Sequence, residues 1–97
     1  MTNLVVSLIL SEIASLLKIK GENSYKIRAY QKASKKIKNL GQDINISVKE
    51  KKVDSLTGIG SSLAHKIEEI VLTGSCKYHQ QLTEEYPLTL ISILSVK

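Results

Sequence analysis

Two glycines that flank a single isoleucine form the most informative stretch of the sequence. Gly58, Ile59 and Gly60 separate two segments whose apolar spacing suits helices, which predicts a tight hairpin. Glycines permit unusual backbone angles and remove side chains that would hold a ligand away, while Ile59 is expected to plug the hairpin into the core. The amides of Gly58, Gly60 and Ser61 would point outward at a helix N-terminus, where a phosphate binds readily. A plain structural turn is the alternative interpretation.

Positive charge is concentrated in one segment of the chain. Residues 18–38 carry eight basic residues against Glu22 alone, a net charge of +7, whereas the whole chain carries +5. A concentrated basic segment beside a slightly acidic remainder predicts a polyanionic partner. A solvated, lysine-rich helix face is the alternative interpretation. The basic residues of this segment are Lys18, Lys20, Lys26, Arg28, Lys32, Lys35, Lys36 and Lys38.

The spacing of the apolar residues predicts an all-α fold. Apolar residues recur at intervals of three, four, seven and eight, and no segment alternates as a β-strand would. We expect one domain, a small bundle of four to six short helices, with the hairpin motif at residues 53–73. The expected helical segments are residues 4–17, 25–39, 47–56, 61–73, 75–85 and 88–96.

Polar residues and glycines mark several of these helix ends. Ser24 and Ser61 are expected to cap the helices that follow them. Ser47 with Glu50 three residues later has the spacing of a capping box. Gly41 and Gly74 are the expected stops of the helices before them.

The helix predicted over residues 25–39 has two contrasting faces. At about 100° per residue, apolar side chains gather on one side and cations on the opposite side. One helix is therefore expected to present a core stripe and a cationic stripe. The core stripe consists of Tyr30, Ala33, Ile37 and Leu40, and the cationic stripe of Arg28, Lys32, Lys35 and Lys36.

Composition excludes several protein classes. The 97 residues allow one domain, and a single cysteine, Cys76, excludes a disulfide-stapled secreted fold. The apolar run at residues 4–10 is far shorter than the ~20 residues of a membrane helix, and no basic segment precedes it. We expect an intracellular protein, of the cytoplasm and nucleoid or of the nucleus, with no membrane partner. His65, His79 and Cys76 lack the spacing of zinc ligands, and no catalytic triad is visible.

The hairpin and its surroundings resemble known DNA-binding proteins. Residues 56–67 are similar to the helix-hairpin-helix motif of DNA repair proteins, which grips the sugar-phosphate backbone without reading bases. Residues 19–33, the Thr73-Gly74 helix end and the Tyr86-Pro87 pair resemble the N-terminal domain of family X DNA polymerases, the group that includes DNA polymerase beta. The resemblance covers nearly the whole chain. It implies sequence-independent binding to gapped or nicked duplex DNA, or to its 5′-phosphate ends, in base excision repair.

The same resemblance implies a larger parent protein. In the family, a second helix-hairpin-helix and a nucleotidyl-transferase domain follow the point where this chain ends. The apolar stretch that reaches Lys97 also has no cap and no polar tail. We therefore expect residues 1–97 to be a single DNA-binding domain, either cut from a polymerase or free-standing, with the missing polymerase domain of the parent chain as a partner.

The family resemblance also implies roles for single residues. Lys66 matches a lysine whose amine forms a Schiff base with an abasic sugar phosphate and releases it by β-elimination. Ser62 and Tyr78 stand where lyase-competent relatives carry basic residues, so the chain departs from the lyase pattern at two positions. From the hairpin, the cationic stripe and the resemblance together, the expected DNA contacts are Gly58, Ile59, Gly60, Ser61, Ser62, Lys66, Lys26, Arg28, Tyr30, Lys32, Lys35, Lys36 and Lys77.

No cofactor is required by this interpretation. The resemblance implies that Na⁺ or K⁺ can bind at the hairpin through the backbone carbonyls of Leu56 and Ile59.

Two alternative functions remain open from the sequence. One is an active 5′-deoxyribose-phosphate lyase with Lys66 as its nucleophile, which borohydride trapping on abasic DNA would reveal. The other is a helical protein-interaction module. Salt dependence separates the module from a DNA-binding domain, because counterion release gives a slope of about −0.9 per phosphate contacted on duplex DNA.

Overall fold

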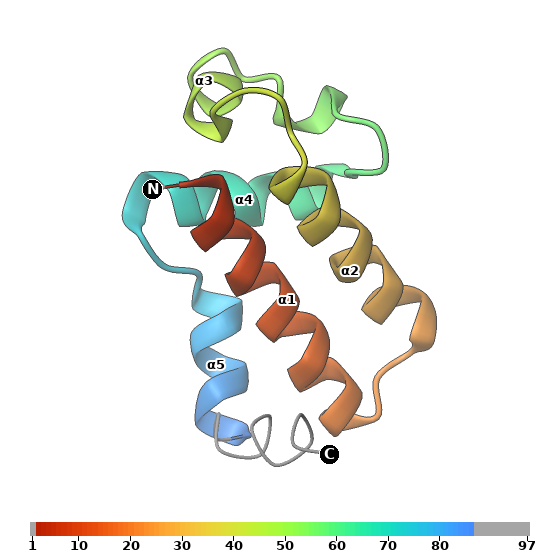
Figure 1. The fold of residues 1–97 in the computed structure, drawn as a ribbon. Coiled ribbons are helices and arrows are strands. Elements are labelled where there is room, and N and C mark those ends of the chain that lie inside the picture. The colour runs from red at the N-terminus through yellow and green to blue at the C-terminus, as the bar shows by residue number, and fades with distance from the viewer. Residues whose placement is uncertain (1, 87–97) are drawn as a thin grey trace.

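The described part of the chain folds into a small bundle of five α-helices and one short 3₁₀ helix (Figure 1). The computed structural model describes residues 2–86, and these residues contain no β-strand. The predicted all-α fold is confirmed. The elements are α1 (Asn3–Lys20), α2 (Ser24–Lys38), α3 (Ile44–Lys49), η1 (Val53–Ser55), α4 (Ser61–Thr73) and α5 (Lys77–Glu85).

Helix α1 is the central helix, with α2 on one side of it and α5 on the other (Figure 1). It begins one residue before the predicted 4–17, where Thr2 caps it by accepting a hydrogen bond from the Val5 amide at 3.2 Å, and it continues to Lys20. Gly21 ends it in the left-handed conformation, at φ 79°. Asn3 ties its first turn to the start of α3, because its side chain accepts a hydrogen bond from the Ile44 amide at 2.8 Å.

Helix α2 confirms the two predicted stripes. Tyr30, Ala33 and Ile37 are buried and Leu40 is partly buried, whereas the four cations of the opposite stripe are exposed. Its ends differ from the prediction. Asn23, and not Ser24, is the cap, because its side chain accepts the Tyr25 amide at 2.8 Å. The helix closes at Asn39, before Gly41.

The capping box predicted at Ser47 and Glu50 is wrong. Helix α3 starts at Ile44, where the Asp43 carboxylate accepts the Asn45 amide at 2.9 Å. The backbone amide and the side-chain amide of Asn45 both donate to this carboxylate, and these hydrogen bonds lower the pKa of the Asp43 carboxyl below its usual value. Ser47 lies inside the helix and is buried, with its hydroxyl accepting from the Gln42 amide nitrogen at 3.3 Å.

The core is aliphatic, as the composition predicts. The largest fully buried side chains come from α1, α2, α3, η1, α4 and α5, so every described element contributes to one core. Buried Ser7 and Ser34 exchange hydrogen bonds of 2.8 to 2.9 Å between side chains and backbone, which joins α1 to α2 without an unpaired polar atom. Across residues 2–86, no helix combines the length and apolarity needed to cross a bilayer.

The C-terminal half follows the predicted order. Gly74 ends α4 at φ 83°, and α5 begins at Lys77, two residues later than predicted. Cys76 is fully buried at the start of α5. The helix predicted over residues 88–96 lies outside the described residues.

Candidate functional site

The turn between η1 and α4 forms the hairpin predicted from the glycines. The Leu56 carbonyl accepts the Ile59 amide at 3.1 Å, and Gly58 between them has φ +84°. The turn holds position 58 in the left-handed conformation, which L-residues with a side chain rarely adopt. Ile59 is buried, and so is Ala64 in the next helix, so the turn is anchored to the core as predicted.

The second glycine has a different role from the first. Gly60 has φ −80° and ψ 171°, an ordinary extended conformation, so the unusual backbone angle expected of both glycines is confirmed only for Gly58. Gly60 is the N-cap of α4 and its carbonyl accepts the Ala64 amide at 2.9 Å. The expected capping by Ser61 is wrong, since Ser61 is the first helical residue. A Cβ at Gly60 would meet no atom within 4 Å, which leaves the backbone open to a ligand.

The amides expected to hold a phosphate are free to do so. Among the described residues, the amides of Gly58, Gly60 and Ser61 donate to no protein acceptor. The first amides of a helix have no partner inside the helix and carry its positive dipole end. The hairpin therefore presents unsatisfied donors beside the N-terminus of α4.

A pocket of about 480 Å³ lies against this hairpin, walled by α2 and closed by one residue of α5. It brings together residues far apart in the sequence, including six of the predicted contacts. None of the residues that line it is acidic. The lining consists of Gly58, Gly60, Ser62, Leu63 and Lys66 from the hairpin and α4, Tyr25, Lys26, Ala29 and Tyr30 from α2, and Tyr78 from α5.

Both lysines that line the pocket place their ammonium groups over the aromatic ring of Tyr78. The Nζ atoms of Lys26 and Lys66 lie 5.4 Å and 5.2 Å from the centre of its ring. Ammonium groups at this distance are attracted by the ring face. The Tyr30 ring stacks on Tyr78 with centroids 6.2 Å apart and an angle of 25° between the planes.

Lys66 is half-buried at the margin of the apolar stripe of α4, as its position in the sequence predicts. Its Nζ donates to the Ser62 hydroxyl, one helical turn earlier, at 3.3 Å. Glu69, which the sequence places near Lys66, instead accepts the Lys77 backbone amide at 2.9 Å. Lys77 is the first residue of α5, so this bond caps the helix in place of the N-cap residue Cys76, whose side chain makes no cap bond.

Tyr30 is both a core residue and a wall of the pocket. Its side chain is buried, as expected from its place on the apolar stripe. Burial, followed by the nearby Tyr78 and Cys76 side chains, raises the pKa of the Tyr30 phenol above its usual value. The phenol is therefore neutral at every physiological pH.

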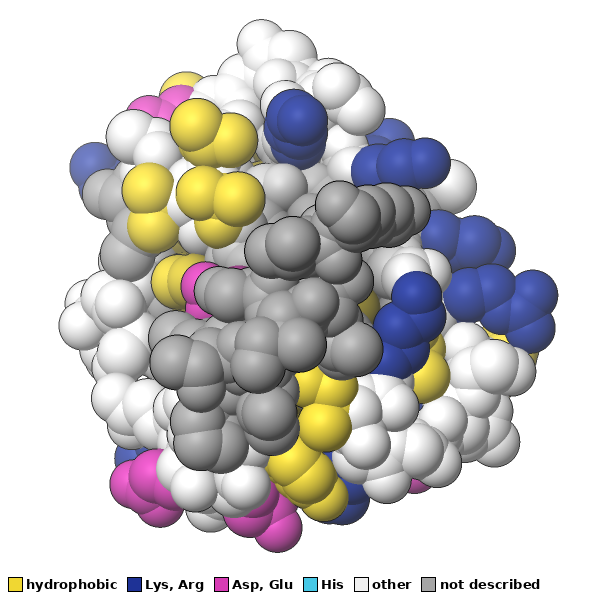
Figure 2. All heavy atoms as spheres, turned by 60° about the horizontal axis from the view of Figure 1, so that its bottom comes forward, with side chains coloured by type: hydrophobic (Ala, Val, Ile, Leu, Met, Phe, Trp, Pro, Cys, Tyr) yellow, Lys and Arg dark blue, Asp and Glu magenta, His cyan; other side chains and the backbone are white. Residues whose placement is uncertain are grey.

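The cationic stripe of α2 adjoins the hairpin only in part. Arg28 and Lys32 line a neighbouring groove of about 350 Å³ together with Gly58, so these two cations lie beside the hairpin backbone. Lys35 and Lys36 are exposed further along α2, and Lys77 is exposed at the start of α5. None of these three lines either cavity. Figure 2 shows Lys and Arg side chains gathered on the side of the molecule where Figure 1 places α2.

Four residues that line the hairpin pocket are not among the DNA contacts predicted from the sequence. Tyr25, Ala29 and Leu63 have helical spacing to predicted residues, and that spacing could have identified them. In the sequence, Tyr78 is distinguished only by its departure from a family pattern. Its position depends on how α5 packs against α1 and brings Tyr78 against Tyr30 of α2, which no local pattern reveals.

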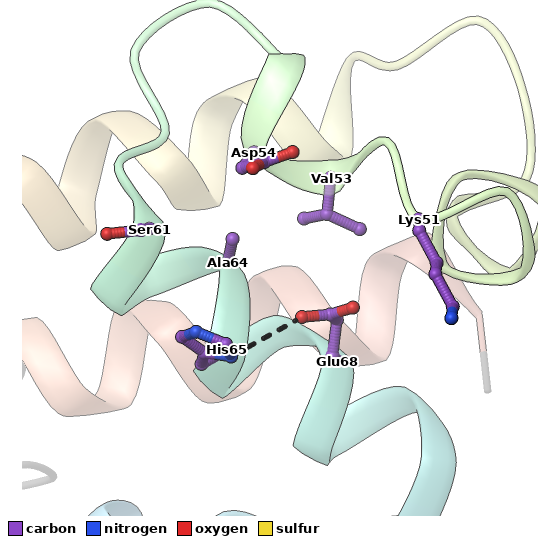
Figure 3. Close-up of a pocket in the computed structure, with 7 residues that line it drawn as sticks. All are labelled: Lys51, Val53, Asp54, Ser61, Ala64, His65 and Glu68. Carbon is purple, nitrogen blue, oxygen red and sulfur yellow. Dashed lines mark ion pairs between the residues drawn. The ribbon is translucent and has the colours of Figure 1, made fainter.

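A second and smaller pocket, of about 190 Å³, lies between η1 and α4 (Figure 3). Ser61 lines this second pocket and does not line the hairpin pocket. His65 and Glu68 also line it and form an ion pair at 3.7 Å when the imidazole is protonated. The described residues hold no cluster of three or more metal-ligating side chains, there or elsewhere.

Comparison with known protein families agrees with this geometry. The family model described as a helix-hairpin-helix domain matches residues 1–76, which include α1, α2, the hairpin and all of α4. The chain is a member of the helix-hairpin-helix domain family. A search of curated proteins gave no match. Within this helix-hairpin-helix domain, α5 is the only helix of the described residues that lies beyond the matched segment.

Proposed function

We propose that this helix-hairpin-helix domain binds DNA through the sugar-phosphate backbone without reading the base sequence. The observation that carries the proposal is a pocket lined by two lysines, by no acidic residue, and by two hairpin glycines whose amides have no protein acceptor. Helix-hairpin-helix domains generally bind DNA non-specifically, which agrees with it. The amides would donate hydrogen bonds to one phosphate, and the ammonium groups of Lys26 and Lys66 would place positive charge beside it.

The cationic stripe of α2 extends this surface. Arg28 and Lys32 flank the hairpin, and Lys35 and Lys36 continue the charge along the helix. Exposed lysines act on DNA as point charges that raise the association rate and release counterions. The stripe therefore contributes affinity and orientation, and no sequence preference.

Charge reversal on this stripe tests the proposal. The double variant Lys32→Glu with Lys35→Glu should weaken binding to all duplexes alike and flatten the slope of affinity against salt. The matched control is Lys49→Glu with Lys52→Glu, which changes the net charge equally at exposed positions that do not line the hairpin pocket. Unchanged affinity in the stripe variant would contradict the proposal, and an absence of salt-dependent DNA binding would favour a protein-interaction module.

We further propose that the preferred DNA is a gapped or nicked duplex with a 5′-phosphate, and that the chain is the N-terminal domain of a family X DNA polymerase. The support is the resemblance of residues 19–33 and 56–67 to that family. In this proposal residues 1–97 are one domain inside the cell, acting in base excision repair with the rest of the parent polymerase. A gapped duplex with a 5′-phosphate should bind more tightly than the same duplex without it.

The proposed Na⁺ or K⁺ at the hairpin is compatible with the local hydrogen bonds. The Leu56 carbonyl uses one of its two lone pairs for the Ile59 amide, and no described residue donates to the Ile59 carbonyl. Both oxygens could therefore coordinate a monovalent cation, which would add positive charge beside a bound phosphate.

The position of Lys66 favours a lyase as the second candidate function. Lys66 is half-buried and lines the hairpin pocket, and its Nζ lies 5.2 Å from the centre of the Tyr78 ring, so its amine could reach a sugar phosphate bound there. The Nζ–C1′ bond would form with loss of water, a proton would leave C2′, and the C3′–O bond would break with the phosphate as leaving group. Borohydride should then link the chain covalently to abasic DNA. Lys66→Ala should abolish the link, and Lys77→Ala should not.

A further inference from the structure

We propose that the hairpin pocket takes a whole unpaired terminal nucleotide, with its base against the Tyr78 ring and its phosphate between Lys26 and Lys66. The inference rests on the proposed DNA binding and specifies the part of the DNA that enters the pocket. It assigns Tyr78 as a contact for the base, a role that neither the hairpin motif nor the cationic stripe supplies.

The size and lining of the pocket exceed what a phosphate alone needs. Its volume of about 480 Å³ falls within the range of roughly 300–1,000 Å³ typical of sites for organic ligands. Three tyrosines line it, and Ala29 and Leu63 add apolar surface. A site for a bare anion would need only the amides and ammonium groups. The apolar and aromatic walls indicate a ligand that also has a planar, weakly hydrated part.

The Tyr78 ring is held as a platform. Tyr30 stacks on it and is itself buried in the core, so the pair has a fixed support. The two ammonium groups occupy positions over the same ring at 5.2 Å and 5.4 Å. These are the ends of flexible side chains, which an arriving phosphate would attract away from the ring. The ring face would then be available for a base.

A stacked base suits a domain that does not read sequence. Every base has a π-face, so stacking on an aromatic side chain tolerates any sequence and still contributes to affinity. Inside a duplex a base is stacked on its neighbours and cannot reach Tyr78. An unpaired nucleotide at a strand end has no such constraint.

The test uses the full chain and duplexes with a one-nucleotide overhang bearing a terminal phosphate. One duplex carries thymine in the overhang, and its partner carries an abasic tetrahydrofuran residue there. The base should raise affinity by about tenfold, within the range known for base stacking on aromatic residues. Overhangs on the 5′ and on the 3′ strand are compared separately, and an effect at either end supports the proposal and identifies the strand.

Two variants assign the effect to the ring. Tyr78→Leu should remove the tenfold preference for the base, whereas Tyr78→Phe, which keeps the ring, should retain it. Thermal unfolding of both variants shows whether each is folded. A preference that survives Tyr78→Leu would overturn the proposal, because the base would then lie elsewhere.

Failure of this inference is distinguishable from failure of the proposed function. If the chain binds both duplexes equally and with a steep salt slope, DNA binding stands and the base contact at Tyr78 is wrong. If it binds neither duplex, the proposed function fails and the inference fails with it.

Discussion

The two hairpin glycines are the residues whose replacement should separate stability from binding. Gly58 has φ +84°, whereas Gly60 has φ −80° and open space around it. Gly58→Thr places a β-branched residue in the left-handed region and should lower the free energy of unfolding by about 1–2 kcal/mol. Gly60→Thr should leave stability nearly unchanged, since Thr and Gly are similar at an N-cap.

The Gly60→Thr variant also tests whether DNA binds against the backbone of the hairpin. Because Gly60 lines the hairpin pocket, a threonine side chain there should hinder the approach of DNA, and DNA affinity should fall at least tenfold although the domain stays folded. Denaturant unfolding and fluorescence anisotropy measure the two effects. Wild-type affinity in Gly60→Thr would mean that no phosphate approaches this backbone.

Tyr30 should make the fold sensitive to alkaline pH. Its pKa is raised in the folded state, chiefly by burial, so the folded chain favours the neutral phenol. The stabilisation is complete below the unfolded pKa of about 10 and decreases as the pH rises above it. The free energy of unfolding should therefore fall between pH 9 and about 11.5, a range that includes the unfolded pKa of about 10. It should fall less in the Tyr30→Phe variant, which has no phenol to ionise at this position.

A second tyrosine provides the matched control for this pH effect. Tyr25 is 78% exposed, so Tyr25→Phe should follow the wild-type pH dependence. An identical alkaline slope in Tyr30→Phe and wild type would show that other groups, such as the lysines, cause the loss.

Among the single elements, α5 depends on a cap from another helix. The Glu69 carboxylate in α4 accepts the Lys77 amide at 2.9 Å, while Cys76 at the N-cap position makes no side-chain bond. Glu69→Ala should lower the free energy of unfolding by about 1 kcal/mol, as loss of a helix cap does. Hydrogen exchange should accelerate first in the amides at the start of α5.

The neighbouring residue Glu68 offers a control with the same change in charge and helix propensity. It pairs with His65, whose side chain is 82% exposed, at 3.7 Å. Exposed pairs contribute little, so Glu68→Ala should change stability by less than about 0.5 kcal/mol. Equal losses in the two variants would contradict the capping role of Glu69.

Elements were predictable from the sequence where one local signal dominates. The glycine stop at Gly74 and the apolar stripe of α2 were predicted from the sequence and are confirmed. The start of α3 was not, because Asp43 and Ser47 are both good caps and the choice depends on tertiary packing. Burial of Ser47 beside Gln42 decides in favour of Asp43.

At the scale of the whole molecule, the fold assembles the site from three separate segments. The sequence predicted the hairpin and the cations of α2, and it also predicted that both would bind one polyanion. It could not show that Lys26 and Lys66 lie over the same ring, because that depends on the packing of α5 against the bundle. The aromatic character of the pocket is therefore a property of the tertiary structure.

This assembly predicts which amides respond together when DNA binds. In an NMR titration with a gapped duplex, the largest shifts should fall in residues 25–36 and 57–66 and at Tyr78, because all three line adjoining cavities. Amides of α3 should shift little, since α3 lines neither cavity. The three groups should titrate with one dissociation constant, as parts of a single preformed surface do. Shifts confined to residues 88–97, or different constants for α2 and the hairpin, would show that the pocket is not the DNA-binding site.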